Sequence, residues 1–78
     1  MSIYKLVIRE YGTLDSFVDG RIYSDPARAI DDADEILAAG WWNDRQVGSI
    51  TIYKETADLS LGWFRTTEVA YHKTCNIR

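Results

Sequence analysis

Hydrophobic and polar residues alternate along the first part of the chain with the two-residue period of a β-strand. Within residues 3–11, Leu6 and Ile8 share one face, while basic side chains fall on the other. A second strand-like run follows at residues 17–23, and Gly20 inside it predicts a bulge or a tight bend. Strands so close in sequence normally pair as an antiparallel hairpin, so we expect one here.

The next segment has the period of an α-helix and clear signals at both ends. Asp25 can cap the first turn with its carboxylate, and Pro26 suits the first helical position. Gly40 suits the left-handed position that ends a helix. The spacing therefore predicts a helix over residues 26–39. One side of this helix is narrow and rich in alanine, which allows close approach to a sheet; its residues are Pro26, Ala29, Ile30, Ala33, Ile36 and Leu37.

Two further strands are predicted after a connection at residues 41–44. Residues 47–54 alternate again, and a loop separates them from a long final strand at residues 62–74. Within that last strand, Phe64 and Val69 differ in parity, which predicts a bulge or a break.

This order of two strands, a helix and two strands predicts an α+β fold in two layers. We expect a four-stranded, mostly antiparallel sheet with the helix on one face, in a single domain over residues 1–78. One helix can cover only one side of the sheet, so the other side must be solvated or docked on something. The strand order does not follow from the pattern.

The acidic residues are concentrated in the middle of the chain. The 78 residues carry 12 acidic and 9 basic side chains, for a net charge of −3. Residues 10–44 hold nine of the acids and two of the bases, whereas the remainder is net basic. A negative lobe of this kind can steer association with a basic protein surface.

The polar side of the predicted helix is the candidate binding surface. It carries four carboxylates, which we expect to contact a protein partner with a basic surface: Asp31, Asp32, Asp34 and Glu35. The alternative is an ordinary solvated face, since acids near a helix N-terminus also complement its macrodipole. Of the two tryptophans after the helix, one should pin the helix end to the sheet. We expect Trp42 to join the contact surface.

The sequence lacks the residue patterns of common enzymes and metal sites. His72 and Cys75 are the only strong soft ligands, and a structural zinc site needs four. On one strand, three residues apart, their side chains would leave opposite faces and could not form a nucleophilic pair. Phosphate-binding glycine motifs and the nucleophile-elbow motif do not occur. We therefore expect no enzymatic activity, no metal and no cofactor.

The layout of the chain resembles that of small anti-defence proteins carried by phages and mobile elements. A strand at Ile3–Glu10 opens the chain, an amphipathic helix lies in the middle, and a strand at Ser49–Lys54 leads the closing hairpin. In size, charge and layout the chain is similar to the anti-CRISPR inhibitors of type I effector complexes. The resemblance implies inhibition by binding, without catalysis. The partner would be a CRISPR effector subunit with a basic nucleic-acid channel, or a nuclease whose recruitment is blocked.

Two other interpretations stay open. A small nucleic-acid-binding regulator could use Lys5, Arg9 and Arg65 on the outer face of the sheet. Against it, the sequence pI is about 4.9, where such domains are usually basic, so nucleic acid is the less favoured partner. The other interpretation is a homodimer in which two outer sheet faces pack together.

Targeting signals are not visible in the sequence. It does not open with a basic segment followed by a long apolar run, and its apolar stretches are too short to span a bilayer. Cys75 is alone, whereas small secreted domains usually need disulfides. We therefore expect a cytoplasmic protein, located in the host cell if a phage encodes it.

Overall fold

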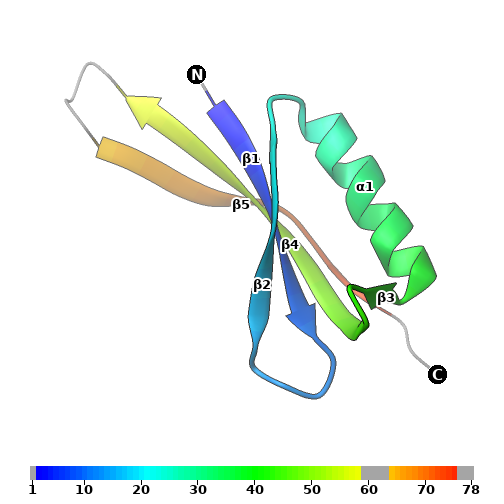
Figure 1. Cartoon of the computed structure of the whole chain (residues 1–78). Helices are drawn as coiled ribbons and strands as arrows, with labels where there is room; N and C mark the ends of the chain where they lie inside the picture. The colour runs from blue at the N-terminus through cyan, green and yellow to red at the C-terminus, as the bar shows by residue number, and fades with distance from the viewer. Residues whose placement is uncertain (1, 59–63, 76–78) are drawn as a thin grey trace.

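In the described part of the chain, one helix packs on a curled antiparallel sheet (Figure 1). The computed structural model describes residues 2–58 and 64–75, with all side chains in these ranges except those of residues 18–20, 58, 64 and 65. The elements, in chain order, are β1 (Ser2–Glu10), β2 (Ser16–Tyr23), α1 (Pro26–Ala39), β3 (Trp41–Trp42), β4 (Arg45–Asp58) and β5 (Phe64–Thr74). The predicted α+β architecture is therefore confirmed.

The four long strands lie in the order β2-β1-β4-β5, and each neighbouring pair is antiparallel. β2 and β4 flank β1 and therefore run in the same direction, and α1 provides the crossover between them. The predicted hairpin of the first two strands is confirmed. The order also makes β1 and β4 the central strands. Each of them has a neighbouring strand on both sides, which helps to bury its side chains.

β3 departs from the sequence prediction, which gave only a connection at residues 41–44. Trp41 and Trp42 pair with Gln46 and Arg45 at the start of β4. Asn43 and Asp44 form the turn between the two strands with positive φ angles of 52° and 65°. Asn and Asp tolerate that conformation better than most residues, so the chain reverses at once after the helix.

Both ends of α1 lie where the sequence predicts them. The Asp25 carboxylate accepts a hydrogen bond from the Ala27 amide at 3.0 Å, which satisfies one of the unpaired N–H groups of the first turn. At the other end Gly40 has a φ of 76°, and its amide donates to the Ile36 carbonyl at 3.0 Å. The helix therefore begins at Pro26 and stops at Ala39.

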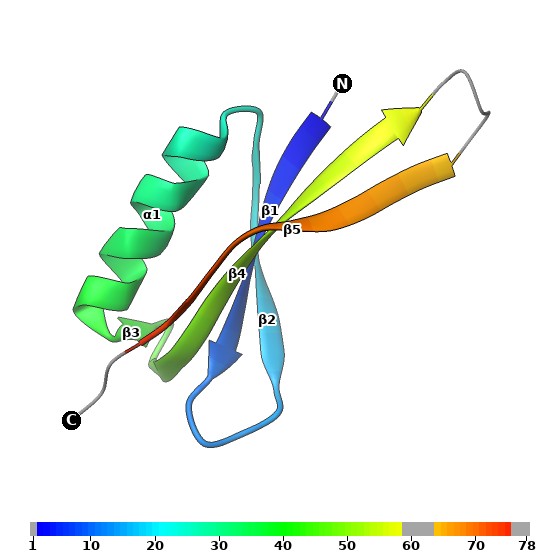
Figure 2. The same cartoon turned by 180° about the vertical axis from the view of Figure 1, so that it is seen from behind.

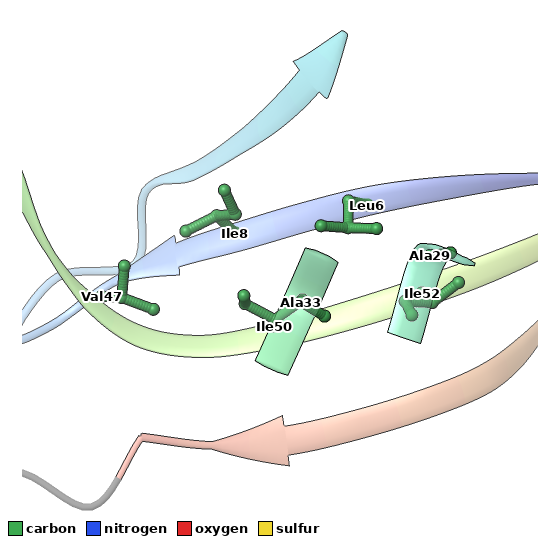
Figure 3. Close-up of a cluster of buried hydrophobic side chains, with 7 residues drawn as sticks. All are labelled: Leu6, Ile8, Ala29, Ala33, Val47, Ile50 and Ile52. Carbon is green, nitrogen blue, oxygen red and sulfur yellow. The ribbon is translucent and has the colours of Figure 1, made fainter. Parts of the chain in front are cut away.

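The hydrophobic core lies between α1 and the two central strands (Figure 3). Ala29 and Ala33 are the buried residues of the helix, and their small side chains let its backbone approach the sheet closely. Ile30, Ile36 and Leu37 flank them and are half-buried, whereas Pro26 is exposed. The sheet contributes the remaining buried side chains of the core: Leu6, Ile8, Val47, Ile50 and Ile52.

Irregular pairing occurs in β2, β4 and β5. In β2 the register shifts across residues 19–21, which include Gly20, so the irregularity predicted there is confirmed. β5 also has a bulge, but it lies at Ala70, whereas residues 64–69, where the parity of Phe64 and Val69 predicted it, pair without a shift. A third shift, which the sequence pattern did not predict, lies at Gly48 of β4. Because of it, Val47 and Ile50 both face the core although they differ in parity.

The two views place α1 on one side of the sheet and no described element on the other (Figures 1 and 2). The distal part of the β4–β5 hairpin extends beyond the helix, and the molecule measures 47 × 24 × 18 Å. One face of the sheet is therefore covered by the helix, and we call the opposite face the outer face.

Candidate partner-binding face of α1

The exposed side of α1 carries the acidic residues that the sequence singled out. Asp31 and Glu35 lie opposite the buried alanines and are exposed. They are four residues apart, so their carboxylates are neighbours on the helix surface. Within the part of the chain that the structure describes, neither side chain takes part in an ion pair or a side-chain hydrogen bond. We call these two residues the outward acidic pair.

Asp32 does not lie on the outward face as expected but on the flank of α1 that faces β2. Its carboxylate accepts a hydrogen bond from the Tyr23 hydroxyl at 2.6 Å and an ion-paired one from Arg21 at 3.2 Å. The Tyr23 hydrogen bond lowers the pKa of Asp32 below 3.8, partial desolvation opposes this, and Arg21 and Arg28 lower it further. Asp32 therefore holds the helix to β2 and is not part of the outward acidic pair.

Asp34 lies on the other flank, beside β5. Its carboxylate accepts a hydrogen bond from the Tyr71 hydroxyl at 2.7 Å, and the Lys73 ammonium is 4.0 Å away. That hydrogen bond, together with some desolvation and the charge of Asp34, raises the pKa of Tyr71 above 10.0. The Asp34 side chain is nevertheless 48% exposed, so it borders the outward acidic pair and can contribute charge there.

The two contacts fix the helix from both sides. Tyr23 belongs to β2 and Tyr71 to β5, the two outer long strands of the sheet. Each tyrosine leaves the core-facing side of its strand and ends on a helix carboxylate. The predicted group of four acids is therefore divided: two hold the helix in place, and the outward acidic pair faces solvent.

The tryptophans exchange the roles that we expected of them. Trp42 packs against the core, and its ring lies 6.3 Å from that of Phe17, with Arg45 stacked 4.0 Å from the Phe17 ring centre. Trp41 is the exposed one, at 60%. Adjacent residues of a strand point to opposite faces, so the pairing of β3 with β4 sends only one of the two indoles inward.

The basic residues that the nucleic-acid interpretation relies on have different environments. The Lys5 ammonium lies 3.3 Å from the Glu55 carboxylate, which offsets its charge. Arg9 is exposed, and the side chain of Arg65 lies outside the described residues. Of these bases, Arg9 is exposed without a described ion pair, and the nucleic-acid interpretation stays a prediction.

His72 and Cys75 leave opposite faces of the sheet, as their spacing predicts. The His72 ring hydrogen-bonds the Thr51 hydroxyl at 2.8 Å on the outer face, while the Cys75 thiol donates to the Leu37 carbonyl on the helix side. They therefore do not form a nucleophilic pair. Among residues 2–58 and 64–75, no three His, Cys, Asp or Glu side chains gather as a metal site would require.

A depression with a volume of about 540 Å³ lies where β2 leads into α1. Arg21, Arg28, Asp25 and Asp32 line it together with residues 22–24. It is a shallow, wide-open depression in which bases and acids alternate, and Arg21 is already paired with Asp32. The lining of this depression therefore favours neither an anionic nor a cationic ligand.

Comparison of the chain with protein-family models, with curated proteins and with solved structures gave no match. None of the described helices has the length and apolar character needed to cross a membrane.

Proposed function

We propose that this protein acts by binding, without catalysis, and that the outward face of α1 contacts a basic surface on a partner protein. The observation that supports this is the outward acidic pair, exposed on a helix that Tyr23 and Tyr71 hold from both flanks. Like charges four residues apart on a helix repel by a few tenths of a kcal/mol, and a cationic partner relieves that repulsion. Because the helix is already fixed, little ordering is needed on binding.

The resemblance in layout to anti-CRISPR proteins narrows the proposed partner to a type I effector complex. The outward acidic pair and the bordering Asp34 would take the place of nucleic-acid phosphates in a basic channel of that complex, or cover the surface that recruits its nuclease. The proposed place of action is the cytoplasm of the host cell. Exposed Trp41, at the end of the same helix, is the side chain that can add apolar contact at the margin.

The test measures binding of the full chain to a purified type I effector complex loaded with guide RNA, by surface plasmon resonance. The double variant Asp31→Asn, Glu35→Gln removes the outward acidic pair and touches no described contact. We expect its Kd to rise at least tenfold, mostly through slower association, and its binding to lose most of the salt dependence seen with the wild type.

A matched control removes the same charge elsewhere. Asp15 and Asp44 are exposed in loops, and the variant Asp15→Asn, Asp44→Asn should bind within twofold of the wild type. If both double variants lose the same affinity, binding depends on the net charge of the chain alone. If the Asp31→Asn, Glu35→Gln variant binds like the wild type, α1 is not the contact surface. Thermal unfolding of both variants checks that the fold is kept.

A further inference from the structure

The outer face carries both charged and large apolar side chains, which is unusual for a sheet face exposed only to solvent. Across its middle, Lys5 lies between Ile22 of β2 and Tyr53 of β4, and Tyr53 lies beside Val69 of β5. Antiparallel sheets with one solvated face normally alternate between apolar residues inside and polar residues outside. Here the outer positions carry several large apolar side chains.

Two of these apolar side chains are strongly exposed. Ile22 is 65% and Val69 is 59% exposed, and they lie on the two outer long strands. Between them, Ile3, Val7 and Tyr53 are half-buried. These apolar side chains are distributed over all four long strands, with Lys5 and Glu55 among them, and such a mixture of apolar and charged residues is typical of a protein interface.

The charges at the centre of the outer face complement each other. Lys5 and Glu55 come from adjacent strands and form the ion pair described above, with 33% and 15% of their side chains exposed. If two outer faces meet across a two-fold axis, the Lys5–Glu55 pair of one copy can lie against the same pair of the other copy, in the opposite orientation. Every ammonium then lies between two carboxylates, so the face is complementary to itself.

The chain exposes more surface than a compact monomer of its mass. Such a monomer is expected to expose about 4,900 Å², whereas this chain of 9.0 kDa exposes 5646 Å². The radius of gyration, 13.5 Å, also exceeds the roughly 11.5 Å expected for a compact chain of this length.

We infer that the outer face is a homodimer interface, on which a second copy of this chain packs face to face. The two sheets form the inner layers of a sandwich, and the two helices lie outside. This arrangement keeps the acidic faces of α1 far apart, which limits repulsion between copies. It is independent of the proposed partner on α1, because the two surfaces lie on opposite sides of the sheet.

The test determines the mass of the full chain by sedimentation equilibrium from micromolar to millimolar concentration. The wild type is expected to approach twice the chain mass. The variants Lys5→Glu and Glu55→Lys each place like charges at the centre of the interface, so each alone should show a Kd for dimerisation at least tenfold higher. A mixture of the two restores opposite charges across the axis and should form a heterodimer.

Controls separate the interface from general charge effects. Ile22→Lys and Val69→Lys change exposed side chains on the outer face and should also give monomers, while their circular dichroism stays unchanged. Ala38→Lys adds the same charge on the exposed side of α1 and should leave the dimer intact.

Three results would overturn the inference. The first is a wild type that keeps the mass of one chain throughout, which would leave the face to solvent or to a different partner. The second is a dimer that none of the four outer-face variants weakens. The third is failure of the mixed charge variants to associate when each alone is folded and monomeric. None of these results bears on binding through α1.

Discussion

At the scale of single residues, the two tyrosine–carboxylate contacts explain how a narrow helix stays in place. The buried stripe of α1 consists of Ala29 and Ala33, which bury little apolar surface each. A helix held only by this stripe could roll on the sheet. Tyr23 and Tyr71 reach it from opposite sides and fix its rotation, which in turn fixes where the outward acidic pair points.

The Asp32 contact makes a prediction about stability at acid pH. The pKa of Asp32 in the folded state lies below its ordinary value of 3.8, chiefly through the Tyr23 hydrogen bond. A group with a lowered folded-state pKa contributes stability above its unfolded pKa and loses it as the pH falls through the folded value. We expect Asp32→Asn to be less stable than the wild type near neutral pH, and the difference to shrink as the pH falls below 3.8.

Urea unfolding followed by tryptophan fluorescence at a series of pH values measures this difference. Asp31→Asn is the matched control, since Asp31 has no ion pair or side-chain hydrogen bond among the described residues. Its unfolding free energy should follow the wild type at every pH. If both variants lose stability in parallel, the Asp32 contact does not contribute to the fold as the geometry indicates.

The sequence was informative about the site, but it could not separate the four acids. All four are polar residues of one amphipathic helix, and the pattern placed them on a single side. At 100° per residue, Asp32 lies only about 80° from the centre of the alanine stripe, and Asp34 about 120° on the other side. Both positions are flanks, where a tyrosine at a sheet edge needs an acceptor for its hydroxyl. Locating those tyrosines required the strand order.

At the scale of elements, the pattern predicted those features that local chemistry determines. Asp25, Pro26 and Gly40 set the ends of α1 through capping and backbone geometry within a few residues, and both ends are confirmed. β3 was missed because two residues are too few for any periodicity. The position of β4 beside β1 was left open, since pairing between distant segments depends on packing that no local pattern contains.

Gly48 of β4 is the position at which the packing of the sheet leaves no room for a side chain. A Cβ atom at this position would lie 3.0 Å from the Tyr11 Cα and 3.2 Å from the Arg9 carbonyl oxygen. Both are backbone atoms at the end of β1 or directly after it. Unlike the atoms of a side chain, they cannot move aside by a rotamer change. The absence of a side chain lets β4 bulge here and return Val47 to the core.

We therefore expect Gly48→Ala to destabilise the protein by about 1–3 kcal/mol, the usual cost of forcing atoms into a packed site. Chemical unfolding measures it. Gly40→Ala is an instructive contrast, because no atom lies within 4 Å of its added Cβ and its cost comes only from the positive φ of 76°. That cost should be about 1 kcal/mol and should be smaller with Asn, which tolerates the conformation. A Gly48→Ala variant as stable as the wild type would contradict the close approach.

At the scale of the whole molecule, the core is one-sided. All the described buried side chains lie between α1 and the helix-facing side of the sheet, and the outer face contributes none of them. A small domain without disulfides has few other sources of stability, and packing a second sheet on the outer face would supply one. In the proposed arrangement the two exposed surfaces have different roles: the outer face would join two copies, and each copy would present its acidic helix outward.

Thermal unfolding tests this division of roles in one measurement. If unfolding is coupled to dissociation of a dimer, the wild-type Tm must rise with protein concentration, since mass action favours the associated folded state. For a hundredfold increase in concentration we expect a rise of roughly 8 °C in a domain of this size. The Lys5→Glu variant should have a lower Tm that does not depend on concentration, whereas the Asp31→Asn, Glu35→Gln variant should follow the wild type. A Tm that is constant for the wild type would mean that the helix-covered core alone stabilises the chain.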